Sequence, residues 1–178
     1  MLVKACVQSL RFLDQSHSRG LVVLQEDDGD RVLPICIGPS EATAIAIELY
    51  QEKFPRPLTH DLLAAVLGGL GGVLQKVIIN RVEEDTYFAE LIIQRDGDVI
   101  SIDARPSDSI ALALRTQAEI FVDEELIGLM AMETSEAALF ATPDQMQSGV
   151  DSAEELAADD LKEYLRKLAP EDFGRFTP

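Results

Sequence analysis

Hydrophobic and polar residues alternate in several short stretches of the chain, a pattern typical of β-strands that are buried on one face. The clearest alternation places four apolar side chains on one face of a strand predicted over residues 86–94: Tyr87, Ala89, Leu91 and Ile93. Neighbouring strands are predicted over residues 73–83 and 98–104, and the dipeptide Asp96-Gly97 is a strong hairpin signal. These three strands are therefore expected to form an antiparallel meander.

The remaining elements come in clusters rather than in strict alternation of strand and helix. Further strands are predicted over residues 2–13, 19–26, 31–37 and 120–122. Helices are predicted to begin near Ser40, Thr59 and Pro106, and a helical stretch is predicted over residues 123–140. Such clustering indicates an α+β fold, in which a compact antiparallel or mixed β-sheet carries helices packed on it.

The last third of the chain contains the best candidate for a domain boundary. Residues 142–151 are expected to form a linker, because they combine Pro143 and Gly149 with polar residues. A final helix is expected after Ser152, which forms a capping-box pattern with Glu155. The predicted organisation is a domain over residues 1–141, the linker, and an acidic helical tail over residues 152–178.

Composition limits the class of protein. A chain of 178 residues that is 47% hydrophobic is not intrinsically disordered, and no apolar run reaches the roughly 18–20 residues that cross a bilayer. The start of the chain is strand-like, and no signal peptide is evident. Cys6 and Cys36 cannot form a disulfide framework and are expected to be buried apolar residues. We therefore expect a soluble cytoplasmic protein with no membrane partner.

The formal charge of −17 argues against tight binding to nucleic acid, because such affinity comes largely from basic side chains that neutralise phosphates. Residues 1–128 carry 11 basic and 21 acidic side chains, and residues 129–178 carry 4 and 11. The acidic excess is therefore densest in the tail, where solvation or contact with a partner would explain it.

Three predicted helix starts share one chemical theme, a proline beside a hydroxyl residue and an acid in the first turn. They are Gly38-Pro39-Ser40-Glu41, Arg56-Pro57-Leu58-Thr59-His60-Asp61 and Arg105-Pro106-Ser107-Asp108. A structural explanation is sufficient for most of these residues, since proline and a hydroxyl cap favour helix initiation and the acid complements the helix dipole. Ser40 is expected to be the N-cap of its helix. The explanation does not account for Arg56, Arg105 or His60.

A functional explanation is that these starts converge on one pocket. A helix N-terminus with an adjacent arginine can hold a phosphate, and His60 could act as acid, base or ligand. Oxygen ligands for a divalent cation such as Mg²⁺ or Mn²⁺ could come from four carboxylates: Glu41, Asp61, Asp103 and Asp108. Such a cation could activate water for phosphodiester cleavage.

The same segments resemble the bifunctional nuclease domain family over about residues 1–130. The likeness rests on three blocks in the family's order and spacing: Leu33–Ala42, Arg56–Leu62 and Asp103–Ala113. It implies a compact α+β domain that self-associates into a homo-oligomer, as a dimer or a larger assembly, and a nuclease that cleaves DNA and RNA as weakly bound substrates.

Carried over to this chain, the resemblance nominates a set of pocket residues. The expected catalytic residues are Asp103, Asp108, His60 and Arg105, and the expected substrate-binding residues are Arg56, Thr59, Ser107 and Ser40. We expect Asp103 and Asp108 to bind metal or act as bases, with Glu41 and Asp61 as further metal ligands. The two arginines would hold the scissile phosphate, and His60 would donate a proton to the leaving oxygen.

Two other hypotheses fit the sequence. The chain could be a non-catalytic module that binds an anion or nucleotide and self-associates, which suits an acidic surface better than a nuclease does. It could also be a structural oligomer whose motifs serve subunit packing. Both the nuclease and the anion-binding module require the helix starts to converge in space, whereas the structural oligomer does not.

Overall fold

The computed structural model describes residues 1–13, 19–130, 132–133 and 163, and within them strands and helices form an α+β fold. The strands are β1 (Leu2–Phe12), β2 (Gly20–Glu26), β3 (Arg31–Ile37), β4 (Val73–Glu83), β5 (Thr86–Arg95), β6 (Asp98–Ala104), β7 (Glu119–Asp123) and β8 (Met132–Glu133). The helices are α1 (Pro39–Leu49), α2 (Thr59–Gly69), α3 (Pro106–Thr116) and α4 (Glu124–Met130). The predicted fold class is confirmed.

The strands form one mixed sheet in the order β6-β5-β4-β7-β1-β2-β3-β8. Strands β4 and β7 are parallel, and the other neighbours in this sheet are antiparallel. The predicted meander is confirmed as β4–β5–β6. Its two turns, Glu84-Asp85 and Asp96-Gly97, have positive φ at both residues, as the type I′ turn of a tight hairpin requires.

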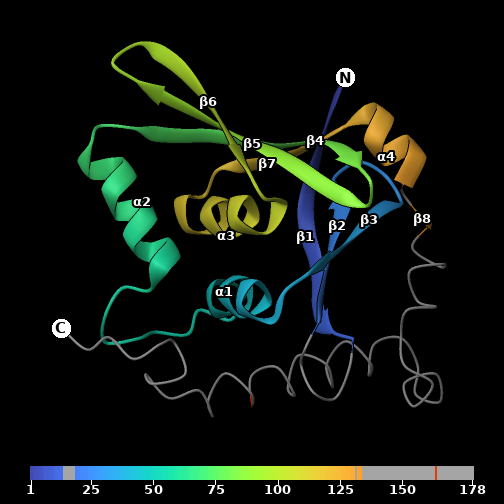
Figure 1. Cartoon of the computed structure of the whole chain (residues 1–178), viewed down its shortest axis with the longest axis horizontal. Helices are drawn as coiled ribbons and strands as arrows, with labels where there is room; N and C mark the ends of the chain where they lie inside the picture. The colour runs from blue at the N-terminus through green and yellow to red at the C-terminus, as the bar shows by residue number, and fades with distance from the viewer. Residues whose placement is uncertain (14–18, 131, 134–162, 164–178) are drawn as a thin grey trace.

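Helices α1 and α3 pack against each other and cover the same face of the sheet (Figure 1). Helix α1 contacts β1 and β2, and α3 contacts β4, β5 and β7. Gly20 permits this close approach, because a Cβ there would lie 2.6 Å from the Cβ of Ala42 in α1. The expectation that α3 is buried is confirmed, since Ile110 to Ala113 are at most 1% exposed.

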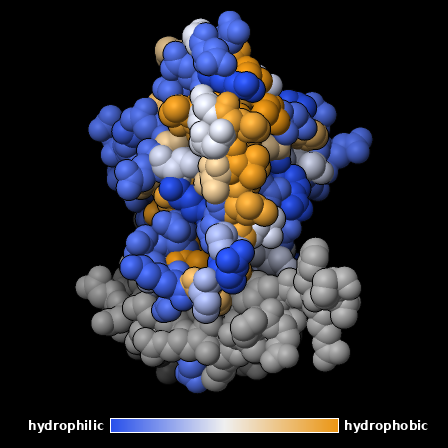
Figure 2. Space-filling model, turned by 90° about the vertical axis from the view of Figure 1, so that its left-hand side faces the viewer, coloured by the Kyte–Doolittle hydropathy of each residue, from blue (hydrophilic) through white to orange (hydrophobic). Residues whose placement is uncertain are grey.

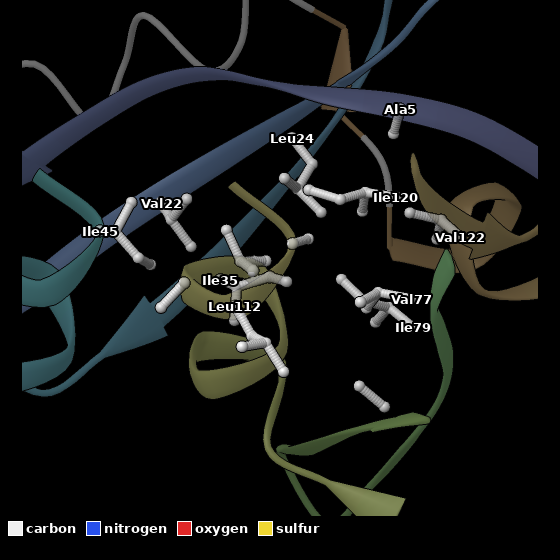
Figure 3. Close-up of a cluster of buried hydrophobic side chains, with 14 of the residues drawn as sticks. Ala5, Val22, Leu24, Ile35, Ile45, Val77, Ile79, Leu112, Ile120 and Val122 are labelled. Atoms are coloured by element: carbon white, nitrogen blue, oxygen red, sulfur yellow. The ribbon is translucent and has the colours of Figure 1, made fainter. Parts of the chain in front are cut away.

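Side chains from both halves of the sheet meet α1 and α3 in one hydrophobic core (Figure 3). Val22 and Ile35 from the β1–β2–β3 side and Val77 from the meander side lie around Leu112 of α3. Helix α2 has no buried residue and contacts mainly α3 (Figure 1). The core therefore fixes α1 and α3 firmly, whereas α2 lies at its margin.

Several local predictions need correction. The helix expected over residues 123–140 ends at Met130 and is followed by β8, which pairs with β3. The N-cap of α1 is Gly38 rather than Ser40, because Pro39 occupies the first helical position. Cys6 and Cys36 are exposed rather than buried. The predicted linker and the tail helix lie outside the described residues.

None of the described helices has both the length and the apolar character needed to cross a membrane.

Candidate functional site

A groove of about 1370 Å³ lies between the starts of the helices and the β5–β6 hairpin. One end is polar and is lined by side chains of the helix starts, including Glu41, His60 and Asp108. The other end is apolar and is lined by α2 and the hairpin: Leu63, Val66, Leu67, Leu70, Leu91, Ile93 and Ile102. The volume exceeds the roughly 300–1,000 Å³ of typical small-molecule pockets.

The starts of α1, α2 and α3 are joined by one network of charged side chains at the polar end. Arg105 donates from Nε to Asp108 Oδ2 at 2.7 Å and from Nη1 to Glu41 Oε1 at 3.0 Å. His60 Nε2 lies 3.2 Å from Asp108 Oδ1. The predicted convergence of the three helix starts therefore occurs, although their motifs are separated by many residues in the chain.

The acids of this region occupy equivalent places in their helices. Glu41, Asp61 and Asp108 are each the third residue of a helix, after a start at Pro39, Thr59 or Pro106. A carboxylate in the first turn is stabilised by the positive end of the helix dipole. The repeated helix-start pattern therefore gathers negative charge at one place, where a cation is needed to balance it.

Arg105 supplies that positive charge and remains reachable from solvent. Its side chain is 67% exposed, whereas that of Asp108 is 31% exposed. Burial tends to raise the pKa of Asp108, but hydrogen bonds from Arg105 and His60 outweigh it and hold that pKa below its usual value. Asp108 is therefore an anion at neutral pH, and it can orient His60.

A second ion pair lies beside this network and was not anticipated from the sequence. Arg115, only 4% exposed, donates from Nε to Asp61 Oδ1 at 2.6 Å and from Nη1 to the carbonyl oxygen of Ala44 at 3.0 Å. The other oxygen of Asp61 accepts the backbone N–H of Leu58 at 2.8 Å. Arg115 thus ties α2 to α1 and α3. An arginine in the last turn of a helix is ordinarily explained by the helix dipole, so its sequence position gave no signal.

The remaining nominated residues are dispersed. Ser40 and Thr59 line the groove. Asp103, at the end of β6, is exposed and borders the groove, and its carboxylate makes no hydrogen bond or ion pair with a described residue. Ser107 is buried and lines a neighbouring cavity of about 250 Å³. Arg56 is exposed and does not line the groove.

The carboxylates nominated as metal ligands do not form a cation site in this arrangement. Glu41 and Asp108 both pair with Arg105, and Asp61 pairs with Arg115. Among the described residues, no three His, Cys, Asp or Glu side chains are grouped so that they could hold a metal ion. Metal dependence therefore stays a prediction.

The lowered pKa values predict a loss of stability in acid. Burial raises the pKa of Asp61, but the hydrogen bonds from Arg115 and Leu58 outweigh it, as Arg105 and His60 do at Asp108. Because both pKa values are lower in the folded state, the unfolded state binds more protons in this pH range. Their stabilisation is present above the unfolded pKa of about 4 and is lost as the pH falls through the folded values. Urea unfolding from about pH 5 to about pH 3 should show this decline, and Asp108→Asn should show a shallower one. An unchanged slope in Asp108→Asn would contradict the lowered pKa of Asp108.

Comparison with known proteins places this arrangement in a family. The chain is 37% identical over 161 residues to an uncharacterised protein of Mycobacterium tuberculosis strain H37Rv, a match that covers 90% of this chain and 92% of the relative. It is 26% identical over 152 residues to bifunctional nuclease 1 of Oryza sativa subsp. japonica, covering 80% of this chain and 46% of that protein. It is 24% identical over 140 residues to bifunctional nuclease 1 of Arabidopsis thaliana, covering 77% and 43%.

The chain thus spans less than half the length of these plant relatives. The family model described as the bifunctional nuclease domain matches residues 22–135, which is more than half of the chain and includes the groove and the charged network. This chain is therefore a member of the bifunctional nuclease domain family.

Proposed function

We propose that this chain hydrolyses phosphodiester bonds of DNA and RNA at the polar end of the groove. The observation that carries the proposal is the Arg105–Asp108–His60 network, which brings a phosphate-binding cation, an anion and an imidazole together. The relatives named as nucleases support the same class of reaction. The proposal therefore rests on side-chain geometry as well as on family membership.

His60 is the proton-transfer group in this scheme. When Nε2 carries the proton it donates to Asp108 Oδ1, and this hydrogen bond fixes the orientation of the imidazole ring. Protonated at both nitrogens, His60 donates the Nδ1 proton to the leaving oxygen as the phosphorus–oxygen bond breaks. Attack by water forms the new bond to phosphorus, and a proton returned to the imidazole restores the starting state.

Arg105 is the phosphate-binding group. Its Nε and Nη1 are engaged by Asp108 and Glu41, and its Nη2 makes no hydrogen bond with a described residue. A guanidinium held on two sides presents its remaining N–H groups to a phosphate oxygen in a fixed orientation. Glu41 and Asp108 therefore act as positioning residues for the arginine.

Substrate binding is expected to be weak. The chain carries a net charge of −17, and the two carboxylates of the network offset Arg105 locally. Few phosphates can be neutralised on such a surface, so binding gains little free energy from counterion release. The nuclease would consequently have a high KM and would bind nucleic acid of any sequence only weakly.

The proposal is tested by incubating the purified chain with labelled single-stranded RNA and plasmid DNA in Mg²⁺, Mn²⁺ or EDTA. Cleavage of both substrates that co-purifies with the folded chain is the expected result, and the EDTA arm decides whether a metal assists. Cleavage in EDTA would contradict metal assistance. No cleavage under any condition would contradict a nuclease and favour the anion-binding module instead.

Two further expectations belong with this function. Self-association, which the family resemblance implies, and a cytoplasmic location both stay predictions. Sedimentation of the full chain tests self-association. Fractionation of the source cell tests the cytoplasmic location.

A further inference from the structure

A smaller cavity of about 250 Å³, which we call the side cavity, adjoins the polar end of the groove. It is lined by residues from the end of β3, the turn that leads into β5, and the start of α3. The side cavity and the groove share four lining residues: Glu41, Thr86, Tyr87 and Arg105. A ligand bound at Arg105 can therefore extend from the groove into the side cavity. The volume lies below the roughly 300–1,000 Å³ of pockets for whole small molecules, so it suits one part of a larger ligand.

A buried hydroxyl in the side cavity has no partner. Ser107 is 6% exposed and lines the cavity, and its Oγ makes no hydrogen bond with a described residue. The start of α3 does not use this hydroxyl, because the N-cap of that helix is Arg105. A buried polar group without a hydrogen bond costs free energy. The unpaired hydroxyl therefore indicates a ligand that supplies the missing hydrogen bond.

Two carboxylates that line the side cavity limit the charge of its ligand. Glu41 is paired with Arg105, whereas Asp85 makes no hydrogen bond or ion pair with a described residue. The type I′ turn favours an aspartate at this position, where φ is 62°, but asparagine would serve that geometry equally well. These acids would repel a second phosphate and would accept hydrogen bonds from N–H groups. The side cavity therefore suits an uncharged group that carries N–H donors.

Tyr87 gives the side cavity an aromatic wall. Its ring is partly buried and packs against the hydrophobic core, and its hydroxyl makes no hydrogen bond with a described residue. A ring held by packing keeps one orientation, and stacking of bases on such rings stabilises bound single-stranded nucleic acid. An aromatic ring, hydrogen-bond acceptors and a hydroxyl together are the groups that recognise an unstacked nucleobase.

The apolar end of the groove is the other surface available to a base. Figure 2 shows an apolar band down this side of the molecule, and Val66 and Leu70, on and just after α2, are 47 and 61% exposed. Aliphatic side chains offer a base no hydrogen bond, so this surface does not distinguish one base from another. Discrimination between bases requires donors and acceptors on their edges, and the side cavity supplies them.

We propose that the side cavity binds the nucleobase next to the phosphate held by Arg105, and that it selects guanine. This inference rests on the proposed function, which places the phosphate at Arg105. Guanine carries N1–H and an amino group side by side, and the two oxygens of a carboxylate such as Asp85 accept both. Uracil and thymine instead present carbonyl oxygens on both sides of N3–H, and these oxygens are repelled by a carboxylate. Adenine and cytosine offer one amino group beside an acceptor nitrogen and are intermediate.

Binding of nucleoside monophosphates tests the side cavity without any cleavage. Guanosine monophosphate, uridine monophosphate and inorganic phosphate are each titrated into the full chain and followed by calorimetry. We expect guanosine monophosphate to bind roughly tenfold more tightly than uridine monophosphate, and inorganic phosphate to bind most weakly. Tyr87→Leu should raise the Kd of guanosine monophosphate roughly tenfold, whereas Tyr87→Phe keeps the ring and should retain the affinity.

Asp85→Asn separates base selection from the shape of the turn. Asparagine tolerates the positive φ of this position but lacks the second acceptor oxygen, so most of the preference for guanosine over uridine monophosphate should disappear. Glu84→Gln is the matched control, because it removes the same charge from the same turn at a residue that does not line the side cavity. The control should keep the preference.

Ser107→Ala distinguishes a ligand-binding hydroxyl from a structural one. The hydroxyl has no partner in the free protein, so the substitution should weaken binding of guanosine monophosphate several-fold without lowering Tm. A lowered Tm with unchanged affinity would assign Ser107 to the fold and overturn its place in the subsite.

A cleavage experiment connects the side cavity to the phosphate at Arg105. A labelled RNA with one guanosine in a tract of uridines should be cut next to the guanosine by the unmodified chain, and evenly by Asp85→Asn. Selective binding of guanosine monophosphate by a chain that cleaves nothing would support the base site and overturn only the nuclease. Equal binding of the two nucleotides, equally tight binding of inorganic phosphate, or even cleavage by the unmodified chain would overturn the proposal. So would equal loss of preference in Glu84→Gln.

Discussion

Asp61→Ala is expected to lower the free energy of unfolding by about 2 kcal/mol, which is less than for a fully buried pair because the Asp61 side chain is 37% exposed. The substitution leaves the guanidinium of Arg115, which is 4% exposed, without the carboxylate 2.6 Å from its Nε. An unpaired charge in such a place retains its full desolvation cost. The substitution also removes the acceptor of the hydrogen bond from the N–H of Leu58, a bond that caps α2. Urea denaturation followed by circular dichroism at neutral pH measures the change.

The double variant Asp61→Ala/Arg115→Met separates the ion pair from the helix cap. Methionine keeps an apolar chain in the space of Arg115 but has no charge to desolvate. Because the double variant leaves no uncompensated charge at the buried position of Arg115, it should recover most of the stability lost in Asp61→Ala. A double variant that is less stable than Asp61→Ala would show that Arg115 stabilises the fold through its other hydrogen bonds.

The second large effect is expected on catalysis. His60→Ala and Arg105→Ala should each lower kcat/KM for a labelled RNA roughly a hundredfold or more, since one removes the proton donor and the other the phosphate-binding cation. Arg105→Lys should recover little, because an ammonium cannot reproduce the two-sided contact of the guanidinium with Asp108 and Glu41. Initial rates with subsaturating substrate give these values.

Asp103→Asn is the informative comparison for these variants. Asp103 borders the groove, but its carboxylate has no hydrogen bond or ion pair with a described residue. We therefore expect it to retain most of the activity, although the sequence nominated it together with Asp108. Loss of cleavage in Asp103→Asn, with activity kept in a folded His60→Ala, would move the chemistry from the helix starts to the end of β6.

Local patterns in the sequence anticipated much of the fold. Alternation over Tyr87 to Ile93 predicted β5, and Asp96-Gly97 predicted the hairpin that follows it. The apolar run from Ile110 predicted a buried helix, which α3 is. These features depend on backbone preferences and on periodicity within about ten residues, so the sequence alone is sufficient to predict them.

The candidate site was anticipated only in part. The repeated helix-start pattern identified Glu41, His60, Arg105 and Asp108, and all four meet in the structure. Arg56 carried the same signal, yet it is exposed and does not line the groove. Arg105 is the N-cap of α3, whereas Arg56 lies two residues before Leu58, the N-cap of α2, so the two Arg-Pro pairs occupy different places relative to their helices.

Local sequence patterns are sufficient to predict the conformation of most elements and the chemical types at the helix starts. Which of these elements meet depends on the tertiary packing. Strand β7 enters the sheet between β4 and β1, Arg115 pairs with Asp61 from a different helix, and the apolar side of α2 is left exposed. Each outcome joins residues far apart in the chain, or leaves a surface unjoined. Pairing of this kind depends on how the whole core packs, and no window of sequence contains that information.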